Sequence, residues 1–240
     1  MSGRSCSARP RGGTGTGPSR TRALLLMGAL SGPLFTAAHL VEGVRRPDHE
    51  PVRDPVSSLA LGRRGAVQTA SFLTTGALTA AGAYGWHRTP ASGADTWGPR
   101  LLGLWGAGLI GAGLFTTDPA PARTPAASPR TVRGALHDAS SLAAFAAVTG
   151  AALTGLGRPR RGREPGWSGY SAATAMTFTV AMGAAITGHE RPGSTLARRA
   201  GLYQRLALTS ALAWQTTLML RHLTYDGGSL RCSGRPRWTP

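Results

Sequence analysis

The chain contains no lysine. All 27 of its basic residues are arginine, set against only 10 acidic residues, and the formal net charge is +17. A charge of this size suggests a nucleic-acid partner when basic and aromatic side chains are interleaved on one folded surface. Here the arginines gather between long uncharged stretches, without that interleaving. We therefore expect no nucleic-acid binding, and we attribute the exclusive use of arginine to a GC-rich coding bias.

Cysteine is nearly absent, and so are the short motifs of well-known enzyme classes. Cys6 and Cys232 lie near opposite ends of the chain. This excludes a disulfide framework and a cysteine-based metal site. There is no HExxH sequence, no pair of histidines four residues apart, and no glycine-flanked nucleophile elbow. Local motifs therefore identify no activity.

Long uncharged stretches are what the chain does contain. Six blocks carry little or no charge, and each has about the length that crosses the hydrocarbon core of a bilayer as a helix. Backbone groups in lipid need internal partners, so each block should be a helix. Alanine, glycine, serine and threonine dominate them, and small residues allow helices to approach closely. The predicted helices are 23–41, 66–86, 101–117, 135–156, 169–187 and 202–220.

We therefore predict an all-α protein, a polytopic transmembrane bundle of six helices over residues 21–222. Disordered tails are expected at 1–20, which is basic, and at 223–240. With both termini on one side, 15 arginines lie on that side and 11 on the other. The positive-inside rule then predicts a multi-pass cell-membrane protein with cytoplasmic termini. In the alternative interpretation, the first block is a signal peptide cleaved near Ala38, which leaves five helices.

The starts of the even-numbered helices resemble one another. Residues 64–71 parallel residues 133–140, and residues 199–204 form a weaker third copy. Such a repeat predicts three helical hairpins with Gln68, His137 and Tyr203 at equivalent depth. Chance similarity in a chain rich in alanine, glycine and arginine is the alternative interpretation.

Acidic and histidine side chains gather on the side opposite the termini. Acidic residues contribute little to orientation, so this asymmetry has another cause. It indicates either a polar site on the outer side or neutralisation of nearby arginines. The residues concerned are Glu42, Asp48, Glu50, Asp54, Asp118, Asp138, Glu190, His39, His49, His137 and His189.

Eight residues on this side are candidates to line a ligand pocket. In the first outer loop, serine hydroxyls could bind a ligand or simply cap a short interfacial helix that leads to Gly62. The side chains of His137 and Asp138, which open the fourth helix, point in directions about 100° apart. The helix dipole alone would favour an aspartate at this position. The arginine near the start of the last helix could extend to the interface or pair with Asp118 or Asp138. The candidates are Asp54, Ser57, Ser58, Gln68, Asp118, His137, Asp138 and Arg205.

A metal centre is a narrower hypothesis for the same side of the protein. Nitrogen and oxygen ligands from His39, Asp118, His137 and His189 would suit zinc. A bound zinc ion would activate water for hydrolysis of a lipid. Their spacing matches no local metal motif.

Several short motifs occur in an order that resembles a known family. Asp54-Pro55-Val56-Ser57-Ser58-Leu59-Ala60-Leu61-Gly62 is followed by Gln68, by Gly113–Pro119, by His137-Asp138 and by a polar, tyrosine-bearing start of the last helix. Over residues 22–222 the chain resembles the bacterial domain-of-unknown-function 998 family of integral membrane proteins. The resemblance implies a six-helix membrane protein and brings no established activity.

The leading functional hypothesis is an outward-facing polar pocket that binds a lipid headgroup or a small ligand, with membrane lipid as the partner. A metal-dependent membrane hydrolase acting on lipid is one alternative, and whether the protein is an enzyme stays open. A small transporter is the other. It would need polar groups near the midplane and broken helices, and Gly32-Pro33 is the only helix-breaking pair in a predicted span.

Overall fold

The computed structural model describes residues 17–89, 96–119, 129–155 and 165–228. Within these ranges the regular secondary structure is helical and there is no strand, which confirms the predicted all-α fold of six helices. The long helices are α1 (Gly17–Arg45), α2 (Gly65–His87), α3 (Trp97–Leu114), α4 (Val132–Thr154), α5 (Pro165–Glu190) and α6 (Ala200–Gly228). The short 3-10 helices are η1 (Val56–Ala60) and η4 (Ala197–Arg199).

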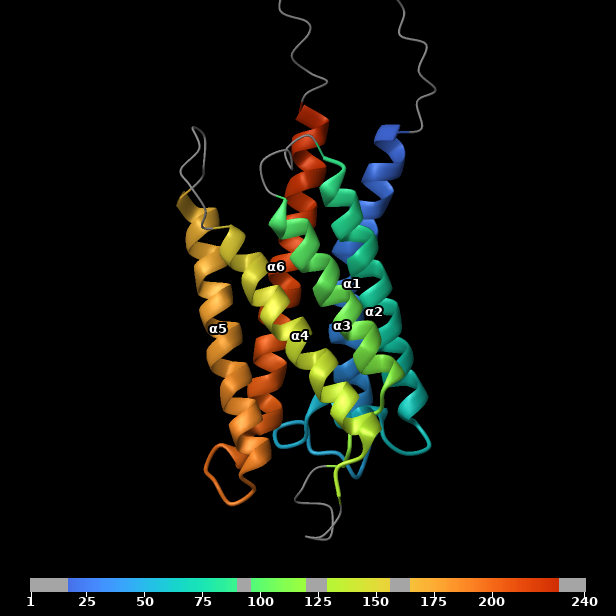
Figure 1. Cartoon of the computed structure of the whole chain (residues 1–240), viewed down its shortest axis with the longest axis vertical. Coiled ribbons are helices and arrows are strands. Elements are labelled where there is room, and N and C mark those ends of the chain that lie inside the picture. The colour runs from blue at the N-terminus through green and yellow to red at the C-terminus, as the bar shows by residue number, and fades with distance from the viewer. Residues whose placement is uncertain (1–16, 90–95, 120–128, 156–164, 229–240) are drawn as a thin grey trace, which may run out of the picture.

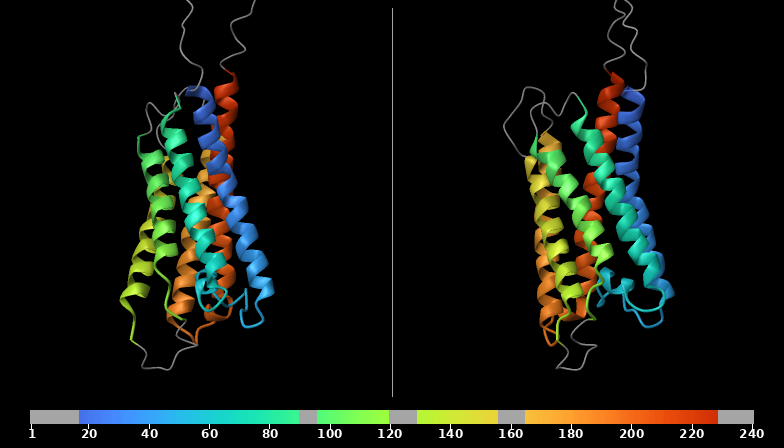
Figure 2. Two further views of the ribbon diagram at one scale, coloured as in Figure 1. Left: turned by 90° about the vertical axis from the view of Figure 1, so that its right-hand side faces the viewer. Right: turned by 45° about the vertical axis from the view of Figure 1, so that its right-hand side comes forward.

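The six helices form one bundle in which chain neighbours run antiparallel (Figures 1 and 2). Each packs against the next along the chain, and α6 packs against α1, so that the ring of helices closes. The start of α1 and the end of α6 lie at one end, called the terminal end below. The opposite end holds η1 and η4 and is called the η1 end. This layout of three hairpins fits the repeat hypothesis.

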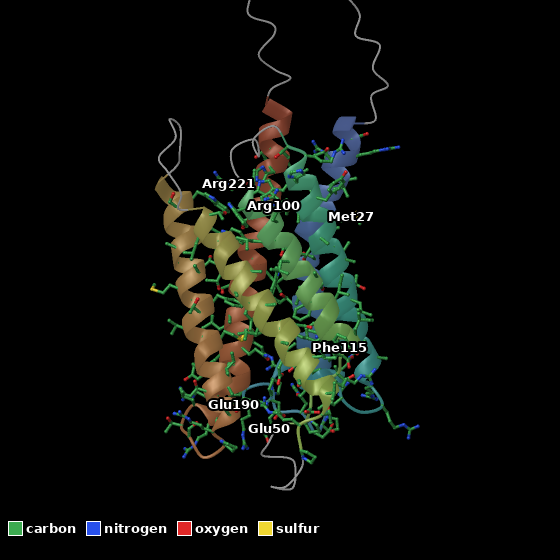
Figure 3. The ribbon with its side chains drawn as sticks, viewed as in Figure 1. Met27, Glu50, Arg100, Phe115, Glu190 and Arg221 are labelled. Atoms are coloured by element: carbon green, nitrogen blue, oxygen red, sulfur yellow. The ribbon has the colours of Figure 1, made fainter. Side chains whose placement is uncertain are left out.

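The exterior of the bundle has the character of a membrane protein. The helical segments Ser19–Arg45, Val132–Thr154 and Gly166–Glu190 are long and apolar enough to cross a bilayer. Large apolar side chains such as Leu142 and Met176 are exposed along the helices, which is unusual for a protein surface in water. Charged side chains are found at both ends of the bundle (Figure 3).

All six helices begin before the apolar block that predicts them, and four of them also end after it. α1 begins at Gly17 and α6 continues to Gly228. The reason is that apolar length measures only the hydrocarbon core, whereas a helix can continue through the polar interface. Residues 17–20 and 223–228, predicted as parts of tails, are therefore helical. The remaining tail residues, 1–16 and 229–240, lie outside the described residues.

Helix α3 ends earlier than predicted. The apolar run predicts an end at Thr117, but the helix stops at Leu114 because Phe115 adopts an extended conformation, with φ −105° and ψ 115°. The next residues, two β-branched threonines and then Asp118-Pro119, do not favour continuing the helix. Backbone carbonyl groups at the end of α3 are therefore available to side chains of other helices.

Close packing depends on small residues, as the composition indicates. A Cβ atom added to Gly28 of α1 would lie 2.7 Å from Cα of Gly82 in α2. A Cβ atom on Gly76 of α2 would lie 2.5 Å from the carbonyl oxygen of Gly106 in α3. At these points the helix backbones themselves are in contact.

A hydrogen-bond network around Gln215 joins four helices in the middle of the bundle. The two hydrogens of its Nε2 are shared among the carbonyl oxygen of Gly28 (3.1 Å), Oγ of Ser31 (2.5 Å) and Oγ1 of Thr79 (3.0 Å). Its Oε1 accepts from Nε1 of Trp105 at 3.0 Å. This set of five residues, called the central network below, satisfies each polar atom that it buries.

Two tryptophans inside the bundle are buried and also form hydrogen bonds. Trp105 belongs to the central network, and Trp214 donates from Nε1 to Oγ of Ser171 in α5 at 3.0 Å. Both rings are at most 1% exposed. Indole groups buried in this way usually find an acceptor.

Candidate functional site

Arg205 anchors the loop between α1 and α2 to the first turns of α6. Its Nη1 donates to the carbonyl oxygens of Pro51, of Asp54 (2.8 Å) and of Gly201 (3.1 Å). The loop backbone also pairs with the start of α6, where Gly201 N–H donates to the carbonyl of Arg53. The arginine is 8% exposed. It therefore has a structural role, as one of the two interpretations of this residue proposes, although its contacts are not with Asp118 or Asp138.

His49 connects this arginine to the acidic side of the loop. Nη2 of Arg205 lies 2.9 Å from Nε2 of His49, and since arginine can only donate, that nitrogen accepts. The proton of the neutral ring is therefore on Nδ1, which faces Oγ of Ser58 at 3.4 Å and Oδ2 of Asp54 at 3.8 Å. Oδ2 of Asp54 also accepts from the backbone N–H of Glu50 at 2.7 Å. Asp54 and Ser58 are thus used to shape the loop.

Helix η1 covers the end of the bundle. Val56 and Leu59 are fully buried, and η1 packs against α1, α2 and α6. The backbone N–H of Val56 donates to Oε1 of Gln204 at 2.6 Å. Gly62, which ends this covering segment, has φ 73°, a conformation that favours glycine. The short helix expected before Gly62 is present over Val56–Ala60, but its N-cap is Pro55 and no side chain caps it, so the capping role considered for the two serines is wrong.

His137 of α4 caps the end of α3. Its Nδ1 lies 3.0 Å from the carbonyl oxygen of Ala112 and 2.8 Å from that of Phe115. Carbonyl oxygens only accept, so Nδ1 carries the proton and Nε2 of the neutral ring keeps a lone pair. The ring is 4% exposed. This contact exists because α3 ends at Leu114 rather than at Thr117.

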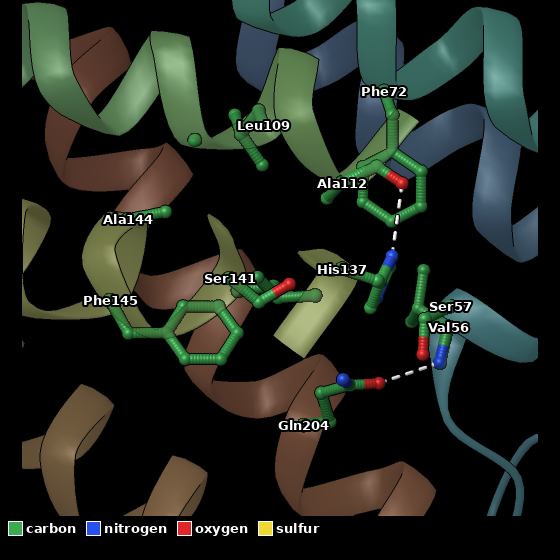
Figure 4. A pocket seen from close by; sticks show the side chains of 12 residues that line it. Val56, Ser57, Phe72, Leu109, Ala112, His137, Ser141, Ala144, Phe145 and Gln204 are labelled. Atoms are coloured by element: carbon green, nitrogen blue, oxygen red, sulfur yellow. Dashed lines mark hydrogen bonds between the residues drawn. The ribbon is translucent and has the colours of Figure 1, made fainter. Parts of the chain in front are cut away.

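A cavity of about 30 Å³ lies beside His137 (Figure 4). That is room for at least one water molecule, and more if side chains move. Its lining is mixed, with hydroxyl, imidazole and amide groups on one part and aliphatic and aromatic groups on the rest. The lining residues are Val56, Ser57, Phe72, Gly108, Leu109, Ala112, His137, Ser141, Ala144, Phe145, Gln204 and Leu208.

The polar groups on this lining have hydrogen-bonding capacity left. Nε2 of His137 makes no hydrogen bond among the described residues, and neither do the hydroxyl groups of Ser57 and Ser141. The amide of Gln204 uses its oxygen on η1, which leaves its NH₂ group to donate. The cavity therefore offers both donors and acceptors.

The helix α5 contributes nothing to the cavity wall. The lining comes from α2, α3, α4, η1 and α6, and α4 packs against α5 much less extensively than against α3. Figure 1 shows α4 and α5 separating toward the η1 end. Phe145 of α4 and Phe178 of α5 pack edge to face, with ring centroids 5.6 Å apart. Nearer the η1 end, Arg130 forms ion pairs with Asp138 at 3.6 Å and Glu190 at 2.7 Å.

Asp118 lies outside the cavity and supports the start of α4. Oδ1 accepts from the hydroxyl of Thr131 at 2.6 Å, and Oδ2 accepts from its backbone N–H at 2.9 Å. The Thr131 hydroxyl in turn accepts from the N–H of Gly134 as the N-cap of α4. The two hydrogen bonds from Thr131, that of its hydroxyl first, hold the pKa of Asp118 below its usual value.

The predicted residues thus fall into four groups. Ser57 and His137 line the cavity, and Gln68 is buried next to it on α2, one turn from Phe72. Three candidates form the loop anchor and two lie on the surface at the start of α4. The loop anchor contains Asp54, Ser58 and Arg205, and the surface pair is Asp118 and Asp138.

The structure does not gather the residues of the zinc hypothesis. Among the described residues no three His, Cys, Asp or Glu side chains are grouped so that they could hold a metal ion. Nδ1 of His39 faces the carbonyl of Phe35 in its own helix, whereas His137 caps α3 and Asp118 supports α4. The fourth residue, His189, lies near the end of α5.

Sequence reasoning missed several functional side chains. Ser141 and Gln204 line the cavity, but neither lies in a motif that marks a site. Gln215 holds the central network, and here a signal was present, because an amide inside an otherwise apolar helix needs a partner. The apolar lining residues Phe72 and Phe145 look like ordinary core residues in the sequence.

Comparison with known families supports the overall assignment. Residues 29–221 match the family model described as "Protein of unknown function (DUF998)". Comparison with curated proteins and with solved structures gave no match.

Proposed function

Because this chain belongs to the DUF998 family of proteins of unknown function, we propose a function from its geometry: it binds a membrane lipid or similar amphipathic ligand in the cavity beside His137. The observation that carries this proposal is the divided character of the lining. Unused polar groups on Ser57, His137 and Gln204 face the same space as the side chains of Phe72 and Phe145.

An amphipathic ligand fits both parts of that lining. Its polar group would accept from the NH₂ of Gln204 and donate to Nε2 of His137. Its apolar part would lie against Phe145 and leave the bundle between α4 and α5, which separate toward the η1 end (Figure 1). The surrounding hydrocarbon would supply such molecules directly.

We also propose how the bundle is oriented. All six helices span the cell membrane, the η1 end faces outward and the termini are cytoplasmic, as the arginine distribution favours. Cys6 and Cys232 serve as reporters, because they are the only cysteines. An impermeant maleimide applied to intact cells should leave both unlabelled and should label both after lysis. Labelling of either in intact cells would overturn this orientation.

Ligand binding is tested by filling the cavity. Ser141→Leu places a larger apolar side chain on the lining, whereas Ala139→Leu makes a similar change at an exposed position on the same helix. Native mass spectrometry of gently extracted protein should find lipid bound to the wild type and to Ala139→Leu, and little on Ser141→Leu. Equal retention by the two variants, or no bound lipid on the wild type, would refute the proposal.

The two alternatives receive less support. The hydrolase hypothesis needs a gathered set of metal ligands, and the described residues do not form one. The transport hypothesis needs polar groups near the midplane that are free to bind a solute, whereas the amide of Gln215 is already hydrogen-bonded to four neighbours.

A further inference from the structure

Three buried side chains near the cavity carry polar atoms that make no hydrogen bond. They are Nε2 of His39, both amide atoms of Gln68 and Nε of Arg205. His39 and Gln68 are fully buried, and Arg205 is 8% exposed. A buried polar atom without a partner costs about 1–3 kcal/mol, so such atoms usually mark a missing water, ion or ligand.

The antiparallel packing of α1 and α2 brings two of these side chains together. The rings of Phe35 in α1 and Phe72 in α2 pack with centroids 5.3 Å apart, which fixes them at one depth. His39 is one turn beyond Phe35 toward the η1 end, and Gln68 is one turn beyond Phe72 in the same direction. Because each lies one turn from a packed ring on the same face of its helix, helical spacing places His39 and Gln68 at the next level of this interface.

The surroundings of this pair leave one approach open. Phe35 and Phe72 lie on the inner side, and η1, with Leu59 fully buried, covers the η1 end. Phe72 also lines the ligand cavity, and its ring centroid is 6.3 Å from that of His137. Phe72 therefore borders the cavity on one side and is followed, one turn toward the η1 end of its own helix, by Gln68.

The unsatisfied atoms define the chemistry of the missing group. Nδ1 of His39 faces the carbonyl oxygen of Phe35 at 3.0 Å, so Nδ1 is the donor and Nε2 of the neutral ring is an acceptor. The NH₂ group of Gln68 is a donor, as is Nε of Arg205. A group that donates to Nε2 and accepts from Gln68 is required. A hydroxyl does both, whereas a phosphate or carboxylate would meet the lone pair of His39.

We propose that His39 and Gln68 form an inner subsite, behind Phe72, for a hydroxyl group of the ligand. This inference rests on the proposed lipid-binding function and narrows it to lipids with a neutral, hydroxylated headgroup. The ester or chain of such a lipid occupies the cavity, and one headgroup hydroxyl reaches between His39 and Gln68. Water is the other source of a hydroxyl, and the experiment separates the two.

The test compares two lipids that share a chain and an ester but differ in hydroxyl groups. Monoolein carries two free hydroxyls, and methyl oleate carries none. Dissociation constants are measured for delipidated full-length protein in detergent. The wild type should bind monoolein about fivefold more tightly than methyl oleate, which corresponds to about one additional net hydrogen bond. The variant Gln68→Leu should bind both lipids equally, whereas Thr74→Val, an exposed polar-to-apolar change on α2, should keep the preference.

Each result has a separate meaning. If the wild type binds both lipids with equal affinity, water or nothing fills the inner subsite, and this inference fails while the cavity remains a lipid site. If Gln68→Leu still prefers monoolein to methyl oleate, the headgroup hydroxyls bind at another place, and the subsite is also refuted. If neither lipid binds, the proposed function itself falls. The comparison of the two lipids on the wild-type protein stays informative even if a variant fails to fold.

Discussion

The central network and the inner subsite are both layers of polar side chains buried between helices, but they differ in hydrogen bonding. In the central network, Gln215 bonds to groups on three other helices. In the inner subsite, Gln68 is equally buried and bonds to none. Buried polar groups whose hydrogen bonds are all made fix the positions of helices. Buried polar groups without hydrogen-bond partners lower stability, and they persist where a ligand provides the missing partner. The first layer therefore looks structural and the second functional.

The largest expected effect comes from breaking the central network. Gln215→Leu leaves Nε1 of Trp105 and the hydroxyl of Thr79 without their amide partner. Hydrogen bonds between membrane helices contribute modestly each, so losing four should lower the free energy of unfolding by about 2–3 kcal/mol. Thermal unfolding in detergent, followed by tryptophan fluorescence, measures this, with the exposed Thr209→Val as control. A loss no greater than that of the control would contradict the structural role.

Backbone contact beside the same network gives the next largest effect. Gly28→Ala would place a Cβ atom 2.7 Å from Cα of Gly82, and because a backbone cannot rotate away the helices must separate. The expected loss is about 2 kcal/mol. Gly183 of α5 has no neighbouring atom within 4 Å of an added Cβ, so Gly183→Ala should be neutral or stabilise by about 0.5–1 kcal/mol. Equal stabilities of the two variants would show that α1 and α2 are not in contact there.

Substitutions at the start of α4, at the η1 end, should have a smaller effect on the free energy of unfolding, and one of these effects should depend on pH. Thr131→Val removes the N-cap and should cost about 1 kcal/mol. The folded-state pKa of Asp118 is lowered, so its contribution is complete above the unfolded value of 3.8 and is lost as pH falls through the lower folded value. The stability difference between wild type and Asp118→Asn should therefore be constant near neutral pH and shrink below 3.8. A difference that grows on acidification would have the wrong sign.

Arg130 should matter little for stability, since its ion pairs are exposed. Its side chain is 66% exposed and those of Asp138 and Glu190 are more than half exposed. Arg130→Gln should change the free energy of unfolding by less than about 0.5 kcal/mol, and less still at high salt. Salt titration of the thermal midpoint measures this. A loss above 1.5 kcal/mol would mean that α4 and α5 depend on this bridge.

Gln68→Leu gives the sharpest contrast with Gln215→Leu. Gln68→Leu removes an amide of similar burial, but one without partners, so the delipidated protein should change in stability by less than about 1 kcal/mol in either direction. The same thermal unfolding measurement applies. If Gln68→Leu and Gln215→Leu destabilise equally, ordered water or another group already satisfies Gln68 and the distinction between the two layers is lost.

Hydrophobic patterning alone determined the class of this protein and the number of its helices. Six uncharged blocks rich in small residues can satisfy their backbones in lipid only as closely packed helices, and the observed bundle has that form. The same pattern predicted the ends of helices less accurately. It predicted an end at Thr117, whereas α3 ends at Leu114, because the backbone conformation at a helix end depends on individual residues such as Phe115.

Tertiary structure alone decided which polar residues meet. The sequence grouped Asp118 with His137 because both border the same loop, yet one supports α4 and the other caps α3 and faces a cavity. It gave no reason to join His39 to Gln68, since only the packing of Phe35 on Phe72 aligns those two helices. Residue types and their order along the chain set what each helix can bury, whereas the depth at which side chains from different helices face each other is set by contacts between residues far apart in the chain.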